Sequence, residues 1–349
     1  MAAGEIGPQA KSARSTPIIA ITQGDPAGVG PEILCKFFAQ GFDEGGWRPL
    51  VIAEGAAIGA VPEITRGNLE ERLVACEGLD NRDSLTGLDA GSVAFLDPVG
   101  ESRHVLLGTS TAADAGGALA AIDVAVDLVQ RGIADAMVTL PVSKESIANH
   151  HLADFRGHTD YLAEKAGLMR YGRDYLMTFL APDLQVALLS THIPLKQAIA
   201  DLSQEQIGDA LDLLQRHAGG RIAVAGLNPH AGEGGLMGDE EEQVIQPAVD
   251  DARDRGILVS GPASPDSLFA RARRREFDWV LALYHDQGLI AVKTASFGTA
   301  TNWTLGLPFL RTSVDHGTAF DIAGSGVADT GPLNQVVKTT LKLIRRRDR

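Results

Sequence analysis

The stretch PIIAITQGDPAGVGPEI, residues 17–33, decides the fold class because a strand, a tight turn and a helix start follow one another in it. Residues 18–22 form a short run rich in β-branched side chains, which is typical of a buried strand. Glycines at positions 24, 28 and 30 supply the turn, and Pro31 suits the first turn of a helix, where its missing N–H needs no partner. The stretch therefore predicts the first strand and helix of an α/β fold.

The same alternation continues along the chain. Further strands are predicted at residues 50–53, 136–140, 185–190, 221–226 and 278–283, and helices at residues 113–131, 204–217, 240–255 and 332–345. Strands that alternate with helices favour parallel, doubly wound sheets. Residues 1–16 are small and polar, so we expect a frayed tail there and not a signal peptide.

The composition of the 349 residues excludes several classes of protein. A net charge of −14 argues against a protein that grips a polyphosphate backbone. No apolar run approaches the roughly 20 residues of a membrane span. Two cysteines, Cys35 and Cys76, supply neither a disulfide framework nor a four-thiolate metal site. We therefore expect a soluble, cytoplasmic α/β enzyme.

Three histidines occupy the same place relative to predicted strands. His192, His230 and His285 each lie a few residues past the carboxyl end of a buried strand, and this edge of an open α/β sheet is where ligands bind. Three imidazoles with one open position are typical of a catalytic zinc site. The alternative is that each is a loop histidine satisfied by its neighbours. We interpret the others in polar or helical contexts as surface residues: His104, His150, His151 and His217.

Basic and amide side chains after His285 indicate an anionic substrate. Lys293 ends a short apolar run, Asn302 opens the sequence NWTLGLP, and Arg311 follows two apolar residues. Arginine presents a fork that matches a carboxylate or phosphate, and lysine adds a point charge. Apolar flanks suggest that these groups are partly buried, which weakens the alternative that they are isolated surface cations.

Two arginine clusters receive no functional role. Residues 271–275 carry four arginines and residues 345–347 carry three, and both are interpreted as solvated helix ends. At a helix C-terminus, cations complement the macrodipole.

Neither of the two common nucleotide-binding motifs is present. The sequence contains no G-x-G-x-x-G fingerprint and no P-loop, which argues against a Rossmann dinucleotide site and an ATP-driven reaction.

Several motifs recur in this order in one known family. They are GDPAGVGPE (24–32), GHTD (157–160), THIPL (191–195), GLNPHAGE (226–233), YHDQG (284–288), LGLPF (305–309) and RTSVDHGTA (311–319). The chain resembles the 4-hydroxythreonine-4-phosphate dehydrogenase (PdxA) family over residues 18–344. Residues 316–324 are also similar to the cofactor loop of isocitrate and isopropylmalate dehydrogenases, which bind NAD without a G-x-G-x-x-G.

The resemblance implies the architecture of those enzymes. We expect two α/β/α lobes with a central cleft: residues 17–130 with 305–349 form the first lobe, which carries the cofactor loop, and residues 131–304 form the second. The family is homodimeric, and its metal ligands come from both subunits, so one chain alone should hold an incomplete site.

The resemblance also assigns roles to residues. The family's metal ligands fall on the same three histidines, His192, His230 and His285, with Zn²⁺ the expected ion and Mg²⁺ or Co²⁺ as alternatives. NAD, or NADP, is the expected cofactor, and the implied cofactor-binding residues are His316, Gly317, Thr318, Ala319 and Asp321. The implied substrate contacts are His158, Thr159, Lys293, Asn302 and Arg311.

The reaction implied by the resemblance oxidises the C3 hydroxyl of 4-phosphooxy-L-threonine. Hydride passes to NAD, and the β-keto acid then loses CO₂ to leave 3-amino-2-oxopropyl phosphate, in the biosynthesis of pyridoxal 5′-phosphate. A metal ion would act on the hydroxyl as a Lewis acid. Lys293 either stabilises charge or handles a proton, and Asp286 is expected to orient the adjacent metal ligand.

Two departures from the family pattern leave the substrate open. Residues 139–144 read TLPVSK, and Trp303 stands where Ile or Val is usual; both flank the expected substrate pocket. Paralogues oxidise 4-phospho-D-threonate or D-erythronate, and others act on cis-diols of aromatic acids. The basic residues favour a phosphorylated substrate. A zinc metallohydrolase and a non-catalytic ligand-binding module are the alternatives from other classes.

Overall fold

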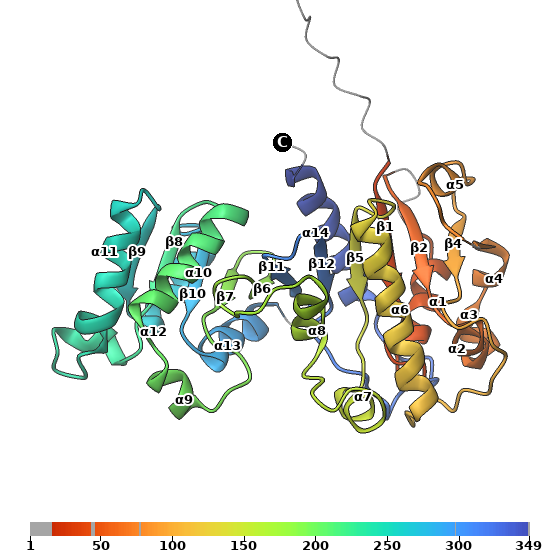
Figure 1. The fold of residues 1–349 in the computed structure, drawn as a ribbon, viewed down its shortest axis with the longest axis horizontal. Helices are drawn as coiled ribbons and strands as arrows, with labels where there is room; N and C mark the ends of the chain where they lie inside the picture. The colour runs from red at the N-terminus through yellow and green to blue at the C-terminus, as the bar shows by residue number, and fades with distance from the viewer. Residues whose placement is uncertain (1–15, 43–45, 77, 297, 348–349) are drawn as a thin grey trace, which may run out of the picture.

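The computed structural model describes residues 16–42, 46–76, 78–296 and 298–347, so nearly all of the predicted N-terminal tail lies outside the described residues. The strands are β1 (Ile18–Thr22), β2 (Arg48–Ile52), β3 (Leu73–Ala75), β4 (Val93–Leu96), β5 (Ala136–Thr139), β6 (Leu176–Leu180), β7 (Gln185–Leu188), β8 (Ile222–Ala225), β9 (Val259–Ala263), β10 (Trp279–Ala282), β11 (Thr301–Leu305) and β12 (Leu310–Ser313). Within the described ranges they form one sheet, in the order β3-β4-β2-β1-β5-β12-β11-β6-β7-β10-β8-β9. Helices cover both faces (Figure 1).

The helices are α1 (Gly30–Ala39), α2 (Gly55–Ala60), α3 (Glu63–Arg66), α4 (Leu69–Arg72), α5 (Asp83–Thr86), α6 (Ala112–Gln130), α7 (Lys144–His150), α8 (His158–Lys165), α9 (Leu195–Ala200), α10 (Gln204–His217), α11 (Gln246–Asp254), α12 (Pro265–Arg273), α13 (His285–Ser296) and α14 (Gly331–Arg347). A turn segment, η1 (Pro229–Glu233), and a π-helical turn, η2 (Glu241–Ile245), complete the described elements. Within this part of the chain, no helix combines the length and apolarity that a bilayer crossing needs.

The mixed α/β class is confirmed, and each predicted strand and helix is present with ends shifted by a few residues. The largest change within an element concerns residues 240–255, where the predicted helix opens as the π turn η2 and continues as α11. Pro247 lies in the first turn of α11, where a missing N–H is tolerated.

The first strand shows why the sheet is covered on both faces. All five residues of β1 are buried, and side chains alternate between the two faces of a strand. Ile18 and Ala20 pack in a cluster with residues of α6, whereas Ile19 and Ile21 pack with α1 and α14. Each large aliphatic side chain buried in this way stabilises the fold by about 1.5–3 kcal/mol.

The centre of the sheet differs from the prediction of parallel strands. β6 and β11 pair antiparallel with each other. β6 also pairs antiparallel with β7, and β11 pairs antiparallel with β12. Only four residues join β6 to β7 and β11 to β12, which is too short for the crossover that a parallel pair needs. In the β11–β12 turn, Gly306 has φ 95°, and a Cβ there would lie 2.3 Å from the Asp174 carbonyl oxygen. The sheet is therefore two parallel sets joined by an antiparallel centre.

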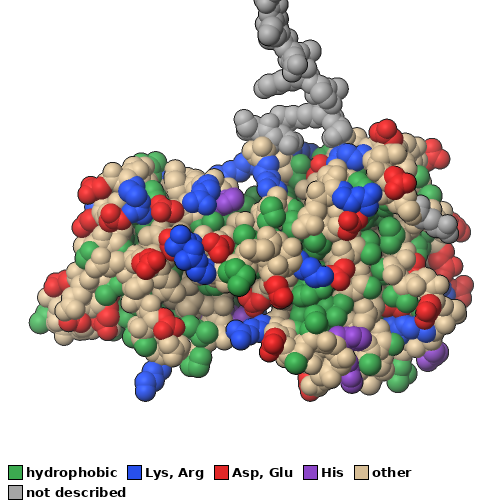
Figure 2. Space-filling model, in the orientation of Figure 1, with side chains coloured by type: hydrophobic (Ala, Val, Ile, Leu, Met, Phe, Trp, Pro, Cys, Tyr) green, Lys and Arg blue, Asp and Glu red, His purple; other side chains and the backbone are tan. Residues whose placement is uncertain are grey.

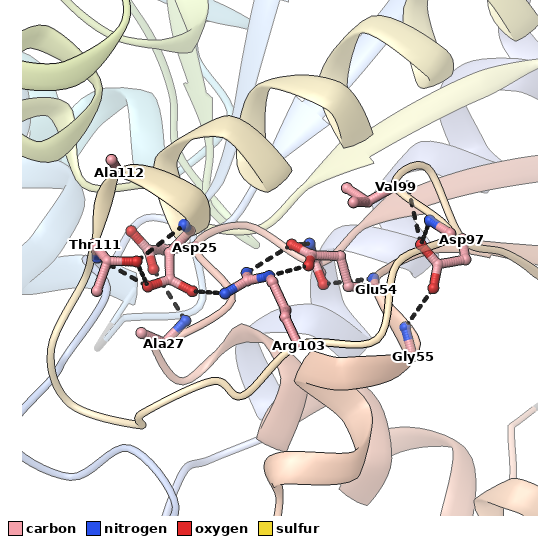
Figure 3. A network of polar contacts seen from close by, with 12 residues as sticks. Asp25, Ala27, Glu54, Gly55, Asp97, Val99, Arg103, Thr111 and Ala112 are labelled. Carbon is pink, nitrogen blue, oxygen red and sulfur yellow. Dashed lines mark hydrogen bonds and ion pairs between the residues drawn. The ribbon is translucent and has the colours of Figure 1, made fainter.

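A buried ion network links the end of β2 to α6 (Figure 3). Arg103 donates from Nε and Nη2 to the two carboxylate oxygens of Glu54, at 2.6 and 3.0 Å, and its Nη1 lies 2.8 Å from Oδ1 of Asp114. The side chains of Glu54 and Asp114 are each 1% exposed. Two carboxylates this deeply buried depend on one guanidinium, because an unpaired buried charge is strongly destabilising.

Gly117 makes room for this network inside α6. A Cβ at position 117 would lie 1.8 Å from Oε1 of Glu54 and 2.8 Å from its carboxyl carbon. Glycine in a helix interior ordinarily costs about 0.5–1 kcal/mol relative to alanine. Here the space for a buried, paired carboxylate outweighs that loss.

This contrast predicts opposite effects for two glycine-to-alanine changes in helices. Gly117→Ala should lower the free energy of unfolding by about 2 kcal/mol or more, because it displaces Glu54 from Arg103. Gly208→Ala, on α10, is the matched control: its Cβ meets nothing closer than 3.7 Å, so it should stabilise the protein by about 0.5–1 kcal/mol. Urea unfolding of both variants measures the difference, and equal shifts would contradict the steric role of Gly117.

Candidate active site

A cavity of about 300 Å³ lies where the antiparallel centre meets the two parallel sets. Its walls come from the ends of β5, β7, β10 and β12, from β11, and from α8 and α13. Nine of the residues expected at the site line it: His158, Thr159, His192, His285, Lys293, Asn302, Arg311, His316 and Gly317. The cavity therefore brings together residues that are more than 150 positions apart in the sequence.

Arg311 is a buried cation without a carboxylate partner in the described part of the chain. Its side chain lies on β12, is 2% exposed, and donates to the hydroxyl oxygens of Thr304 and Thr139 at 3.0 and 2.6 Å. Its Nε has no hydrogen-bond partner. Burial lowers the pKa of Arg311 to about 9, so the guanidinium is charged at neutral pH. A positive charge held in this way is arranged for an anion that enters the cavity.

Other buried polar atoms beside Arg311 are also unpaired. Nε2 of His158, Oδ1 of Asn302 and Oδ2 of Asp315 have no hydrogen-bond partner in the structure. Burial, together with the charges of Arg311 and Lys144, holds the pKa of His158 well below its usual value, so the ring is neutral. Since buried polar groups are usually satisfied, these open atoms indicate where a polar ligand binds.

Three residues that the sequence did not single out also line the cavity. Lys144 begins α7, Arg156 precedes α8, and Asp315 follows β12. Nζ of Lys293 lies 3.7 Å from Oδ1 of Asp315. Burial raises the pKa of Asp315, and the charge of Lys293 opposes that rise. Lys144 lies five residues past the end of β5. A position just after a strand, which marks the three histidines as candidates, could therefore have identified Lys144 too.

His192 and His285 lie together at the carboxyl ends of two neighbouring parallel strands. Their ring centroids are 5.2 Å apart, and β7 pairs directly with β10. Burial lowers the pKa of His192, with smaller contributions from Lys144 and His285. Nδ1 of His285 lies 2.7 Å from Oδ1 of Asp286. These two imidazoles form one edge of the cavity, whereas the Asp286 side chain lies outside its lining.

His230 lies apart from the other two histidines. It follows β8, which borders β10 on the side away from β7, and its side chain is 61% exposed. Its Nδ1 lies 3.1 Å from Oε2 of Glu233, and residues 230–233 all have positive φ. Within the described residues, no three His, Cys, Asp or Glu side chains of the chain are grouped closely enough to hold a metal ion.

The expected cofactor loop follows β12 and packs against the GDPAGVGPE turn. The Thr318 carbonyl accepts from the Val29 N–H at 3.0 Å. The buried Glu32 carboxylate accepts from the backbone N–H groups of Gly324 and Ala328, and the Lys36 ammonium donates to the carbonyls of residues 326 and 328. His316 and Gly317 face the cavity, whereas Thr318, Ala319 and Asp321 lie outside its lining.

One of the two sequence departures does not touch the cavity. Residues 139–142 and Lys144 line it, but Trp303 does not. Asn302 faces the cavity, and successive side chains of a strand point to opposite faces, so Trp303 faces the other side of β11, where it packs near Trp279. The expectation that Trp303 flanks the substrate pocket is therefore wrong.

Comparison with known proteins agrees across sequence and structure. Residues 49–340 match the family model described as "Pyridoxal phosphate biosynthetic protein PdxA". A 4-hydroxythreonine-4-phosphate dehydrogenase of Azoarcus sp. (strain BH72) is 41% identical over 347 residues, which cover 95% of this chain and 98% of that protein. A D-threonate 4-phosphate dehydrogenase of Salmonella typhimurium (strain LT2) is 38% identical over 344 residues, covering 94% and 99%.

A solved structure gives the same result. The crystal structure of 4-hydroxythreonine-4-phosphate dehydrogenase from Klebsiella pneumoniae superposes with a TM-score of 0.81 at 33% identity, covering 94% of this chain and 99% of that one. The fold, the cavity and these similarities together show that the chain belongs to the PdxA family of dehydrogenases.

Proposed function

We propose that the protein oxidises the C3 hydroxyl of 4-phosphooxy-L-threonine with NAD or NADP and releases CO₂, forming 3-amino-2-oxopropyl phosphate for pyridoxal 5′-phosphate biosynthesis. The observation that carries this proposal is the buried, unpaired guanidinium of Arg311 in the cavity. The names of the similar dehydrogenases support the same substrate class.

In this proposal the phosphate occupies the end of the cavity nearest Arg311. The guanidinium supplies the charge, the neutral His158 and the Thr159 hydroxyl contribute hydrogen bonds, and the Asn302 amide orients the polar end of the substrate. Lys144 adds a second positive charge that the sequence did not predict. Hydrogen bonds between a guanidinium and phosphate oxygens are short and about twice as strong as neutral ones.

The chemistry then proceeds at C3 and C2. Hydride leaves C3 for the nicotinamide ring while the hydroxyl proton passes to a base, which gives a ketone. Loss of CO₂ leaves its electron pair on C2 as an enolate, and protonation of C2 completes the product. Lys293, held 3.7 Å from Asp315, is the group we assign to stabilise this charge or return the proton.

The nicotinamide cofactor is assigned to the loop of residues 316–321, with His316, Gly317, Thr318, Ala319 and Asp321 as its contacts. This loop continues directly from the cavity, and Glu32 and Lys36 of α1 hold the segment that follows it. A loop fixed from behind by a buried carboxylate provides a preorganised surface for an anionic dinucleotide.

The donor set fits a divalent metal ion only in part. Burial lowers the pKa of His192, which favours the neutral form that a metal ligand needs, and Asp286 holds Nδ1 of His285, which leaves Nε2 as a ligand atom. When bound, Zn²⁺, or alternatively Mg²⁺ or Co²⁺, would supply Lewis-acid polarisation of the substrate hydroxyl. The third ligand, His230, must come from a second chain.

Exposed apolar side chains support such a homodimer. Ile193 and Leu195, next to His192, are 42% and 52% exposed, and Leu236, on the loop that carries His230, is 82% exposed. Burial of these side chains between two chains would remove apolar surface from water. We propose that the His230 loop of each subunit covers α9 of its partner and completes the site there.

We also propose the two-lobe division around the cavity, with residues 17–130 and 305–349 in one lobe and residues 131–304 in the other. One change to these bounds is needed: β5 pairs with β1 and β12, so we move its four residues from the second lobe to the first. The chain has only two cysteines, both free thiols in the structure, which suits the reducing cytoplasm.

One second substrate has specific support. The D-threonate 4-phosphate dehydrogenase of Salmonella is about as similar to this chain as the 4-hydroxythreonine-4-phosphate dehydrogenases are, and the TLPV departure lines the cavity. 4-Phospho-D-threonate and 4-phospho-D-erythronate carry the same phosphate and secondary alcohol. A cis-diol of an aromatic acid would leave Arg311 without a phosphate partner.

The proposed activity predicts NADH formation from phosphorylated hydroxy acids in the presence of Zn²⁺. 4-Phosphooxy-L-threonine should give the highest kcat/KM, ahead of 4-phospho-D-threonate and 4-phospho-D-erythronate. Unphosphorylated 4-hydroxy-L-threonine should be at least about 100-fold poorer, because it leaves the buried guanidinium unpaired. Absorbance at the NADH band follows each reaction.

The same assay separates the alternatives. A preference for 4-phospho-D-threonate would move the enzyme to the paralogous function. Zinc-dependent hydrolysis without any NAD-linked turnover would show a metallohydrolase.

A shared site predicts complementation between inactive subunits. His192→Ala and His230→Ala should each lose activity, but an equimolar mixture refolded together should recover about a quarter of it, because half of the dimers are mixed and each holds one intact site. The control mixture of His192→Ala and His285→Ala should recover none, since both ligands belong to the same half-site. Equal recovery in the two mixtures would contradict the assignment.

A further inference from the structure

A second hollow lies on the opposite face of β11 from the active-site cavity. It measures about 290 Å³ and is bounded by the C-terminal ends of α10 and α14 and by the β11–β12 turn. Trp303 and Leu310 line it, whereas their neighbours Asn302 and Arg311 line the active site. Strand alternation thus places the two spaces on opposite faces of the same pair of strands.

The hollow combines an apolar floor with a cationic rim. Trp303, Leu307, Phe309, Leu310 and Leu343 supply the floor, and Arg216, His217, Arg346 and Arg347 supply the rim. Figure 2 shows Lys and Arg side chains gathered around a His side chain at the upper middle of the molecule, where α10 and α14 end. An aromatic and aliphatic surface bordered by several cations is the chemistry of an anion-binding pocket with an apolar compartment.

The three arginines of the rim are available to a ligand. Many exposed arginines of this protein pair with a carboxylate, as Arg273 does with Asp183 at 2.8 Å. In the described structure, Arg216, Arg346 and Arg347 form no such ion pair. Burial and the charges of Arg216 and Arg347 lower the pKa of His217, which agrees with a dense positive field in the hollow.

The helix macrodipole explains only part of this arrangement. Cations at the C-terminal end of a helix offset its partial negative charge, which is roughly half a unit for each helix. Two helix ends therefore offset about one of the three guanidinium charges and leave about two positive charges without a partner among residues 16–347 that the structure describes. Neither helix end requires an aromatic floor between the cations.

We propose that this hollow binds an aromatic phosphate, with the ring against Trp303 and Phe309 and the phosphate held by Arg216, Arg346 and Arg347. The volume admits a ligand of one or two fused rings, and a phosphate dianion matches the two uncompensated charges. Arginine is suited to both parts of such a ligand, because its planar fork binds phosphate and also stacks on rings.

Titration of the full-length enzyme with 1-naphthyl phosphate, followed by calorimetry and tryptophan fluorescence, tests this site. The variant Arg216→Gln/Arg346→Gln/Arg347→Gln should bind the probe at least about 30-fold more weakly. The matched control, Arg271→Gln/Arg273→Gln/Arg274→Gln on and beside α12, removes the same charge and should bind it as the wild type does. All six positions are exposed, so both variants are expected to fold.

Three further arms identify what is bound and where. 1-Naphthol and inorganic phosphate, each carrying half of the probe, should bind at least about 10-fold more weakly than the intact probe. Arg311→Met, which disables the catalytic cavity, should retain the tight binding. Loss of binding in Arg311→Met, equal binding of 1-naphthol, or unchanged binding in the rim variant would each overturn the proposal.

Discussion

The organisation of the molecule depends on one electrostatic constraint, which is the burial of the Arg311 charge in the middle of the sheet. The guanidinium contacts two threonine hydroxyls, and no carboxylate in the described structure neutralises it. A buried charge without a counter-ion is destabilising by several kcal/mol, whereas the partly exposed Arg103 in the same protein pairs with two buried carboxylates. Arg103 thus stabilises the fold, whereas Arg311 provides a charge that can bind an anion.

The antiparallel centre is what brings the rest of the site to that charge. Three successive antiparallel pairs separate the two parallel sets, and strand ends from both sets border the cavity beside this centre. His192 and His285 come from one set, and Lys144 and Asp315 come from the other. Since the two faces of β11 carry Asn302 and Trp303, the same strand also separates the catalytic cavity from the second cationic hollow.

Local sequence patterns predicted much of this arrangement. The run at residues 18–22 and the glycine turn after it form β1 and the start of α1, and His192 and His285 lie near each other after the ends of β7 and β10. The same rule could not distinguish them from His230, because the spacing of residues along the sequence does not determine the order of strands in the sheet. β8 lies beyond β10, so its loop reaches away from the cavity.

Other features depend on contacts between distant residues. The strands β6, β11 and β12 are as long as the predicted strands, but the four-residue turns that follow β6 and β11 decide the direction of pairing more than strand composition does. The orientation of Trp303 depends on register, since a shift of one residue exchanges the two faces of a strand. The sequence predicts an ordinary helix end at Arg346 and Arg347, whereas the fold places the end of α10 beside them.

The stability of Arg311→Met with and without ligand measures what the buried Arg311 charge costs and what it binds. Urea unfolding of wild type and variant, in the presence and absence of 4-phosphooxy-L-threonine and without NAD, gives the four free energies. If the Arg311 charge is kept for an anion, the unliganded variant is at least as stable as the wild type, and the ligand stabilises only the wild type. A variant that loses several kcal/mol without ligand, and is stabilised by the ligand as much as the wild type, would contradict this role of Arg311.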